Sequence, residues 1–371
     1  MKIVFLVSQY NPNVLKWGAA LQKEHEVEVI IWDRYGVSSE ILAECEFKDL
    51  KLKFFRLKVP TKNFVLPFFY PLWWLYAFIT LFNKNIEILH PFDLDSLIPM
   101  LFLKRFKKVK LYYTIADFYA DTIPLVYPHI LRRFLSNLER YLLEKADHIF
   151  LVDENRFNNI KGCKIKGLTY IYNTPADTKI SYKNEDKIEN DSLNIFYAGL
   201  LDDQRGIKFL IKAVIESNNV NLKIAGKGPL QSYVESISEK YPEKISYLGF
   251  ISHAKVLDFS ASADIIVAFY DPKVPINKIA SPNKLFEALM LGKPIISNRG
   301  ISIENVIYKE NCGILIEYGN LKELKRSFNI LRDPQLRKEL GKKGRSLYER
   351  KYSWKKMEKK LLNIYGDLHD L

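Results

Sequence analysis

One stretch of the sequence places a carboxylate inside an otherwise apolar helix pattern. It runs from Ser281 to Ser297 and reads Ser-Pro-Asn-Lys-Leu-Phe-Glu-Ala-Leu-Met-Leu-Gly-Lys-Pro-Ile-Ile-Ser. Its carboxylate, Glu287, lies within two turns of the expected helix start, where it could accept hydrogen bonds from two vicinal hydroxyls such as those of a ribose. Free N–H groups at the helix start would favour a diphosphate. The alternative is that Glu287 is a solvated residue on an ordinary amphipathic helix.

The residues around Glu287 predict the elements that must position it. Pro282 suits the first turn of a helix, and the side chains of Ser281 and Asn283 can bond the free N–H groups there. Gly292 predicts the end of the helix, and Ile295 to Ser297 predict the start of a buried strand. The buried face of the helix is marked by apolar residues at helical spacing, namely Leu285, Phe286, Leu289 and Met290.

This segment resembles the signature of the retaining glycosyltransferases of family 4 and their relatives, which have the GT-B fold. In those enzymes a loop ending in Pro-Asn-Lys-Leu-Phe-Glu leads into an Ala/Gly-rich turn and Lys-Pro-Val-Ile, and residues 282–296 follow that order. The resemblance implies that Glu287 binds the ribose of a nucleotide-sugar donor. It also implies that Ser281 to Lys284, with Leu285, line the diphosphate and sugar. Many relatives carry a second Glu eight positions earlier, where this chain has Ile279.

A second loop is predicted to bind phosphate. Gly199 to Ile207 connects a predicted strand to a predicted helix, and such a glycine-bearing loop can hold an anion. Arg205 in this loop offers a planar, permanently charged fork to phosphate oxygens; the alternative is an ordinary solvated arginine. Relatives usually carry two cations here, and the first position is Leu200 in this chain. The resemblance makes Arg205 a catalytic and donor-binding residue, with Lys284 or Lys227 supplying the second charge.

Two further turns match the donor side of the family. Gly226-Lys227-Gly228-Pro229 resembles the family's Gly-x-Gly-Pro turn. The strand and loop over 246–251 supply, in relatives, the backbone that faces the nucleotide base. The resemblance therefore adds Lys227, Phe250 and Ile251 to the donor-binding residues. His253 is expected at the surface, outside the site.

The first half of the chain predicts the acceptor side. The strand over 110–115 ends before Asp117, and this position often carries a His or Asp beside the acceptor in the resembling family. Asp117 is therefore the catalytic candidate for taking the acceptor's proton; its alternative role is to cap a helix over 118–121. His90, at the end of a strand predicted over 86–90, either lines the acceptor side or is structural. A helix is expected from Leu97, capped by Asp95 or Ser96.

Length and pattern predict two α/β domains. The 371 residues are enough for two cores. The expected domains are residues 1–178 for the acceptor, completed by a helix over 354–371, and residues 193–350 for the donor. A polar linker is expected over 176–192. The resemblance implies a GT-B fold, in which two Rossmann-like parallel-sheet domains face a cleft and the C-terminal helix returns to the N-terminal domain.

The charge balance favours anionic partners. The net charge is +13 and the pI about 9.3, which suits nucleotides, anionic lipid surfaces, pyrophosphate-linked lipids or nucleic acid. A nucleic-acid-binding protein is the remote alternative, because the aromatic residues gather in one hydrophobic stretch and are not interleaved with a basic groove. Three separated cysteines and the lack of an export signal predict a cytoplasmic protein. A peripheral place on the inner face of the membrane stays open.

The stretch from Phe64 to Phe82 has no charged residue and many aromatic ones. Three interpretations remain for it: a buried crossover helix with an exposed aromatic face, a monotopic segment at the bilayer interface, or a transmembrane span. Pro67 and Pro71 interrupt its first part, and a strand pattern resumes at Ile86, which argues against the span. The second interpretation predicts an anionic membrane surface as a partner through residues 64–82 and nearby basic faces.

The sequence thus predicts a retaining glycosyltransferase that uses a UDP- or GDP-sugar and a glycan or lipid-linked acceptor, in cell-surface polysaccharide or glycolipid synthesis. No cofactor and no metal are expected: cationic groups and helix N-termini would stabilise the departing diphosphate. Asp93 and Asp95 have the spacing of a metal motif but lie in the domain predicted for the acceptor. The main alternative is an inactive GT-B relative that only binds sugar nucleotide or lipid, because Ile279 and Leu200 depart from the pattern.

Overall fold

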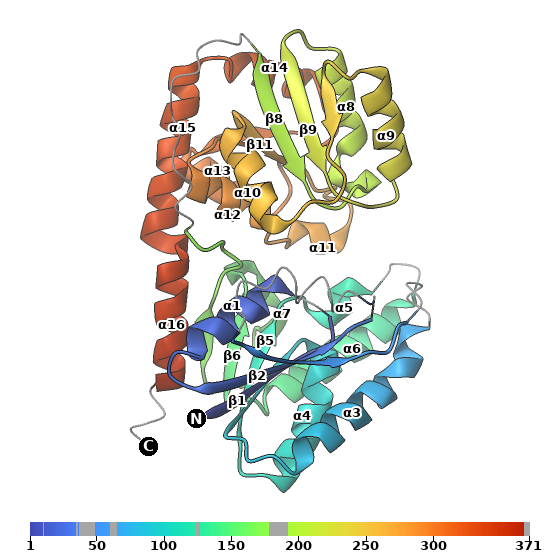
Figure 1. The fold of residues 1–371 in the computed structure, drawn as a ribbon, viewed down its shortest axis with the longest axis vertical. Coiled ribbons are helices and arrows are strands. Elements are labelled where there is room, and N and C mark those ends of the chain that lie inside the picture. The colour runs from blue at the N-terminus through green and yellow to red at the C-terminus, as the bar shows by residue number, and fades with distance from the viewer. Residues whose placement is uncertain are drawn as a thin grey trace. The chain divides into compact units, whose positions relative to one another are not determined.

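The computed structural model describes residues 1–9, 11–34, 36, 49–59, 65–123, 127–177 and 192–366. These residues form two compact units, one of Met1–Tyr172 with Met357–Leu371 and the other of Asn173–Lys356 (Figure 1). Each unit has one parallel sheet with helices packed on it, as the predicted fold class requires. Most of the predicted linker over 176–192, and Phe64 at the start of the aromatic stretch, lie outside the described residues.

Unit 1 is built on a seven-stranded sheet in the order β3-β2-β1-β4-β5-β6-β7. Every neighbouring pair is parallel. Most of these strands are nearly continuous apolar runs, because helices cover both faces of such a sheet. The strand order reverses between β1 and β4, and ligands of open α/β sheets bind beyond the carboxyl ends of the strands at such a point. The strands are β1 (Lys2–Val7), β2 (Glu26–Trp32), β3 (Lys51–Phe55), β4 (Ile88–Phe92), β5 (Lys110–Ile115), β6 (His148–Leu151) and β7 (Leu168–Tyr170).

The helix after β4 begins earlier than its sequence predicts. It starts at Leu94, and no side chain caps it. The predicted cap by Asp95 or Ser96 is wrong, because Asp95 instead forms a buried ion pair with Arg34 at 3.0 Å. The helices of this unit are α1 (Pro12–Leu21), α3 (Tyr70–Phe82), α4 (Leu94–Phe106), α5 (Tyr119–Thr122), α6 (His129–Leu143), α7 (Phe157–Ile160) and α16 (Trp354–Gly366), with 3₁₀ turns η1 (Leu66–Phe69) and η2 (Glu154–Arg156).

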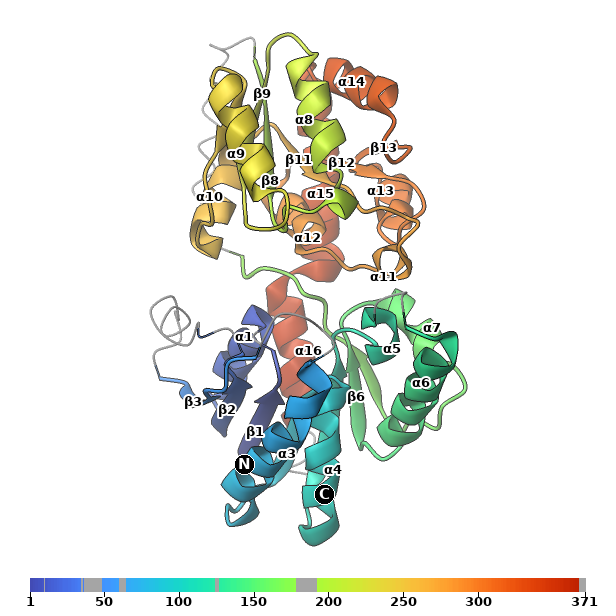
Figure 2. The same cartoon turned by 90° about the vertical axis from the view of Figure 1, so that its right-hand side faces the viewer.

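The C-terminal helix α16 belongs to unit 1, so its predicted return to the N-terminal domain is confirmed (Figure 2). The Tyr365 hydroxyl bonds Nδ1 of His90. His90 is fully buried, and its Nε2 lies 2.6 Å from Oγ1 of Thr114. The imidazole also stacks on Phe92 and Phe150. Of the two predicted roles for His90, the structural one applies, and the acceptor-side role is corrected because no part of the ring is accessible.

Burial of His90 gives a testable pH dependence of stability. Burial first, and then the charge of His148, hold the pKa of His90 well below its ordinary value. Below about pH 6.5 the unfolded chain therefore binds a proton at His90 that the folded chain excludes, so the free energy of unfolding falls on acidification. A His90→Gln variant should be less stable at neutral pH and should lose this part of the pH dependence.

Urea unfolding of both proteins at about pH 7.5 and about pH 5.5 measures the effect. Comparing the two proteins cancels the contribution of the other histidines. If wild type and variant lose the same free energy of unfolding between the two pH values, His90 is protonated equally in the folded and unfolded states.

Unit 2 is built on a six-stranded sheet in the order β10-β9-β8-β11-β12-β13. All pairs are parallel, and the order reverses between β8 and β11. The carboxyl ends of these two strands therefore form the switch point at which such sheets bind ligands. The strands are β8 (Leu193–Ala198), β9 (Val220–Ala225), β10 (Ile245–Tyr247), β11 (Ile265–Ala268), β12 (Ile295–Asn298) and β13 (Gly313–Ile316).

The helix that carries Glu287 forms where the sequence predicts it. Gly292 ends it in a left-handed conformation, with φ of 62°. Its start differs from the prediction: Pro282 holds the N-cap position and no side chain caps the helix. The helices of unit 2 are α8 (Ile207–Ile215), α9 (Gln231–Lys240), α10 (His253–Ser262), α11 (Pro275–Lys278), α12 (Asn283–Leu291), α13 (Glu304–Glu310), α14 (Leu321–Ile330) and α15 (Pro334–Leu347), with a 3₁₀ turn η3 (Asp203–Arg205) and a π-helical turn η4 (Tyr348–Tyr352).

The aromatic stretch forms η1 and α3 within unit 1. One face of α3 is buried through Tyr70, Trp73, Ala77 and Leu81. Trp73 stacks on Trp32 of β2, with ring centroids 5.7 Å apart. The stretch therefore forms a crossover helix with one face buried, and its placement at a bilayer interface stays a prediction. Within the described parts of the chain, no helix is both long and apolar enough to span a membrane.

Candidate functional site

Three loops at the carboxyl edge of the second sheet are joined by backbone hydrogen bonds. Gly199 N, after β8, donates to Ala225 O at 3.0 Å, and Leu201 N donates to Lys227 O at 2.9 Å. Gly226 N, after β9, donates to Gly249 O at 2.8 Å. The loops after β8, β9 and β10 therefore form one continuous framework at the switch point.

Glycine is required at Gly226 because the backbones approach closely. Its φ is 140°, and a Cβ built on it would lie 1.8 Å from the carbonyl oxygen of Gly199. This close approach explains the Gly-x-Gly-Pro turn physically. The turn presents Lys227, whose Nζ lies 4.6 Å from the centre of the Phe250 ring. Both side chains are exposed, so they can contact a ligand at this edge.

Two cations come together beyond β8 and β11. Arg205 donates from Nη1 to Oδ1 of Asn277 at 3.1 Å, and its guanidinium lies 4.2 Å from the centre of the Tyr270 ring. Lys284 places Nζ 4.8 Å from the centre of the Tyr197 ring. A Cβ on Gly199 would lie 2.7 Å from that Nζ. Arg205 is thus held by neighbours and is not an ordinary solvated arginine, and both cations can serve one anion.

The electrostatics keep Lys284 charged. Burial alone would lower its pKa, but the neighbouring Tyr270, Tyr197 and Glu287 favour the ammonium ion, and the net effect is a raised pKa. The charge of Arg205 acts in the opposite direction without reversing this result. This part of the site therefore carries two positive charges near the carboxylate of Glu287.

Glu287 is 5% exposed, and its Oε1 lies 3.1 Å from Nε2 of His253. His253 is the first residue of α10, and its side chain is 58% exposed. The sequence interpretation placed His253 outside the site, whereas the structure pairs it with the central carboxylate. The signal was available in the topology: α10 follows β10, so its first turn lies at the same sheet edge as the first turn of α12.

The start of α12 offers unsatisfied donors to a ligand. Its first turn lacks a side-chain cap. The Ser281 hydroxyl is buried and has no hydrogen-bond partner among the described residues. Backbone N–H groups at such a helix start attract anions. Asn283 is exposed beside them.

Two predicted donor-binding residues are corrected in part. Leu285 is 1% exposed, so its side chain belongs to the core and only its backbone can reach a ligand. Ile251 is partly buried and packs against the cluster that contains Phe196 and Ala225. Ile251 was named because relatives use the backbone of its loop, and Leu285 because it lies in the motif around Glu287; the side chains of both serve packing.

On unit 1, Asp117 lies just beyond β5 with its side chain half exposed. Its Oδ1 accepts from Nη2 of the buried Arg156 at 2.8 Å. The alternative role as a helix cap does not apply, because α5 begins at Tyr119 without a side-chain cap. The carboxylate is therefore oriented by a guanidinium and remains open to a ligand.

Asp93 fixes the backbone of this loop, a role that sequence reasoning missed. Its Oδ1 accepts from Ala116 N at 2.9 Å and from Asp117 N at 3.2 Å. Asp93 has a φ of 61°, uncommon for a residue other than glycine. Burial first, and then the carboxylates of Asp117 and Asp95, raise the pKa of Asp93 to about 8. A pattern of single residues could not show this contact, which joins the ends of two strands.

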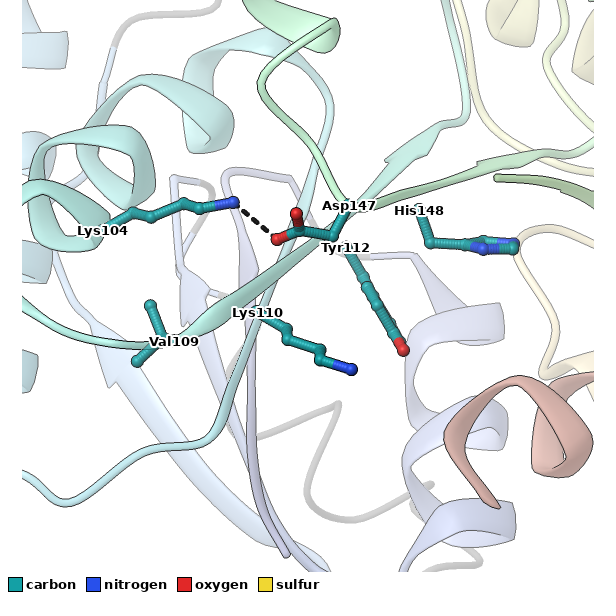
Figure 3. A pocket seen from close by; sticks show the side chains of 6 residues that line it. All are labelled: Lys104, Val109, Lys110, Tyr112, Asp147 and His148. Carbon is teal, nitrogen blue, oxygen red and sulfur yellow. Dashed lines mark hydrogen bonds and ion pairs between the residues drawn. The ribbon is translucent and has the colours of Figure 1, made fainter. Parts of the chain in front are cut away.

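A surface pocket lies elsewhere on unit 1. Figure 3 shows its lining residues, Lys104, Val109, Lys110, Tyr112, Asp147 and His148. They gather at the amino ends of β5 and β6, the edge opposite to the candidate acceptor residues. Asp147 accepts from Lys104 at 2.5 Å and from Lys166 at 2.7 Å, so this carboxylate is already paired. Across the described ranges, no three His, Cys, Asp or Glu side chains gather in a way that could hold a metal ion.

Comparison with solved structures identifies the fold class of this architecture. A sucrose-phosphate synthase from Thermosynechococcus elongatus matches with a TM-score of 0.72 at 16% identity, covering 100% of both chains. Anabaena HepE in complex with UDP and glucose matches with a TM-score of 0.72 at 15% identity, again over 100% of both chains. The chain thus has the GT-B fold of glycosyltransferases.

The family follows from the sequence. Residues 178–347 match the family model described as glycosyl transferases group 1. This part of the chain, which carries Arg205, Lys284 and Glu287, matches the group 1 glycosyltransferases, and the predicted resemblance is confirmed at that level. The narrower placement in family 4 stays a prediction.

Curated relatives agree with the family. An uncharacterized glycosyltransferase of Methanocaldococcus jannaschii is 25% identical over 236 residues, which are 62% of this chain and 58% of that protein. The capsular polysaccharide biosynthesis glycosyltransferase CapM of Staphylococcus aureus is 25% identical over 182 residues, 46% of each chain. The chain spans about half the length of the curated relatives it matches. The family and these names support a glycosyl-transferring enzyme.

Proposed function

We propose that this chain transfers a sugar from a UDP- or GDP-sugar, bound by unit 2, to a glycan or lipid-linked acceptor that unit 1 recognises. The observation that carries the proposal is the arrangement beyond β8 and β11. Arg205 and Lys284, the uncapped start of α12 and the carboxylate of Glu287 lie at one sheet edge. Two cations and a helix start fit a diphosphate, and a carboxylate fits vicinal hydroxyls.

The relatives favour uridine as the base. Anabaena HepE, which has the same fold, was solved with UDP and with UDP-glucose. In our proposal Glu287 accepts hydrogen bonds from the ribose hydroxyls of such a donor. His253 already contacts Oε1 of Glu287, which in our proposal leaves Oε2 for the ribose hydroxyls.

The reaction we propose breaks the bond between the anomeric carbon and the diphosphate. Negative charge grows on the departing diphosphate, and Arg205, Lys284 and the N–H groups of α12 stabilise it without a metal ion. Asp117, oriented by Arg156, takes the proton from the acceptor hydroxyl as the new glycosidic bond forms. Retention of the anomeric configuration is part of the same proposal.

The relatives also support a place in cell-surface synthesis. One is named for capsular polysaccharide biosynthesis and another, from Rhizobium meliloti, for lipopolysaccharide core biosynthesis. We propose a glycan or lipid-linked acceptor for this chain too, and a peripheral site of action at an anionic membrane surface through residues 64–82.

An inactive relative that only binds sugar nucleotide is the second candidate. Leu200 is 51% exposed and supplies no charge to the phosphate loop. Ile279 ends α11 where many relatives carry a carboxylate. Release of UDP or GDP from any sugar nucleotide, dependent on Arg205, would exclude this candidate.

A thermal-shift screen of UDP, GDP, ADP, TDP and CMP and their sugars tests the proposal, with an EDTA arm for metal independence. We expect UDP or GDP to raise the melting temperature of the wild type, with or without EDTA, through binding to the folded state. The shift should be much smaller in Glu287→Ala and somewhat smaller in Arg205→Ala. A shift of wild-type size in both variants would place the nucleotide elsewhere.

A further inference from the structure

Seven large apolar side chains are exposed on two adjacent helices of unit 1. On η1 and α3, the exposed residues repeat at intervals of four and three, so they form one stripe along the helix. Phe102 and Phe106 continue the stripe on α4, which lies beside α3 (Figure 2). We call this set the α3–α4 patch: Phe68, Leu72, Leu75, Ile79, Phe82, Phe102 and Phe106.

The patch is continuous across the two helices. The rings of Phe82 and Phe106 lie 6.2 Å apart, and Phe78 contacts both. The buried face of α3 already packs on the sheet, so the exposed stripe does not contribute to the core of unit 1. Ile79 is 65% exposed and Phe106 is 65% exposed. Contiguous apolar surface of this kind marks an interaction site on a soluble domain.

Cations flank the patch on two sides, while exposed Asp49 and Glu87 bound the same stretch of chain. Arg105 and Lys108 are exposed at the end of α4. Arg56 and Lys58 are exposed just beyond β3, which contacts α3 through the stacked rings of Phe55 and Tyr76. Residues 50–86 contain no Asp or Glu. The acidic residues at the start of α4 are engaged inside the unit, where Asp95 pairs with Arg34.

The geometry points to an anionic lipid bilayer as the occupant: we propose that the α3–α4 patch inserts into its interface. Apolar side chains would enter the headgroup region while the flanking cations pair with lipid phosphates. A second copy of the chain fits less well, because two such surfaces would bring like charges together. Only one face of α3 is free to contact lipid, because the other packs on the sheet. The helix would therefore lie parallel to the bilayer surface and would not cross the bilayer.

One end of the α3–α4 patch lies near the residues proposed to bind the acceptor. The conclusion drawn from this position rests on the proposed function. Its first residue, Phe68, precedes Tyr70, whose hydroxyl accepts from the Tyr119 hydroxyl at 3.3 Å. Tyr119 follows β5 by a few residues, as Asp117 does. The start of the stripe therefore adjoins the edge of the sheet that holds the candidate acceptor residues. A membrane under the patch would present lipid-linked acceptors to that edge.

Vesicle flotation of the full chain tests the proposal. Vesicles of phosphatidylcholine alone are compared with vesicles in which about one third is phosphatidylglycerol. Binding is expected only to the anionic vesicles, and about 0.5 M salt should weaken it. Ile79→Glu should lower vesicle affinity at least about 10-fold, because it places a charge where the proposal inserts an alkyl side chain into the bilayer. Tyr308→Glu, which removes a side chain 78% exposed on α13, is the matched control and should bind like the wild type.

Several outcomes would overturn the proposal. They are absence of flotation, equal binding to both vesicle types, and binding that Ile79→Glu leaves unchanged. A monomer–dimer equilibrium that Ile79→Glu abolishes, without vesicle binding, would assign the patch to a second copy. UDP titration of the same variants separates this proposal from the donor site: failed UDP binding with intact flotation would contradict the proposed function alone.

Discussion

Replacing Glu287 with alanine is expected to weaken UDP binding about 10- to 100-fold. The buried carboxylate would otherwise accept charge-assisted hydrogen bonding from the ribose hydroxyls, and a net contribution equal to one such bond, about 1.5–3 kcal/mol, gives this loss. The 5% exposure of Glu287 makes these bonds strong, since little water competes for them. Calorimetric titration of wild type and variant with UDP measures the difference.

The hydroxyl contact can be isolated with 2′-deoxy-UDP. The wild type should bind it more weakly than UDP, whereas Glu287→Ala should bind the two nucleotides about equally. His253→Ala should have an intermediate effect on UDP, because it removes the partner of Oε1 at 3.1 Å and leaves the carboxylate in place. If the wild type does not distinguish the two nucleotides, Glu287 does not bind the 2′-hydroxyl.

Replacing Arg205 with alanine is expected to lower the rate of sugar transfer about 10²- to 10³-fold, the typical loss when one group that stabilises transition-state charge is removed. Arg205 is fixed by Asn277 at 3.1 Å and by the ring of Tyr270, so it is oriented before the diphosphate begins to leave. The fall should appear in kcat more than in KM, because the charge grows during the reaction.

Two variants serve as controls for Arg205. Asn277→Ala should lower kcat less, because it loosens the guanidinium without removing it. Lys227→Ala should lower kcat less than Arg205→Ala does, since its exposed ammonium lies against Phe250 and outside the pair of cations. Equal losses in the Lys227 and Arg205 variants would mean that general positive charge, and not the oriented guanidinium, promotes the reaction.

Short sequence patterns predicted much of the candidate donor site in unit 2. The helix with Glu287 could be predicted because Pro282, its apolar spacing and Gly292 all act within one segment, and the structure forms α12 there. The turn around Gly226 was also visible, because only glycine allows the approach of its backbone to Gly199. The cation at Arg205 was identified from its place in the loop.

The contacts that complete the sites could not be predicted in this way. Asn277 and Tyr270 reach Arg205 from another strand's loop, and His253 reaches Glu287 from a third. On unit 1, Asp93 contacts the loop that follows a different strand. His90 gave the opposite error: it was predicted to end a strand, but β4 continues to Phe92, and Tyr365, far away in the sequence, covers the His90 ring. Such pairings depend on tertiary packing, which spacing along the chain does not show.

The most direct test is a crystal structure of the protein grown with UDP. The account predicts the diphosphate at the start of α12, within hydrogen-bond distance of Arg205 or Lys284, and the ribose hydroxyls on Glu287. A nucleotide bound elsewhere, or a ribose without contact to Glu287, would contradict the central claim that this sheet edge holds the sugar donor.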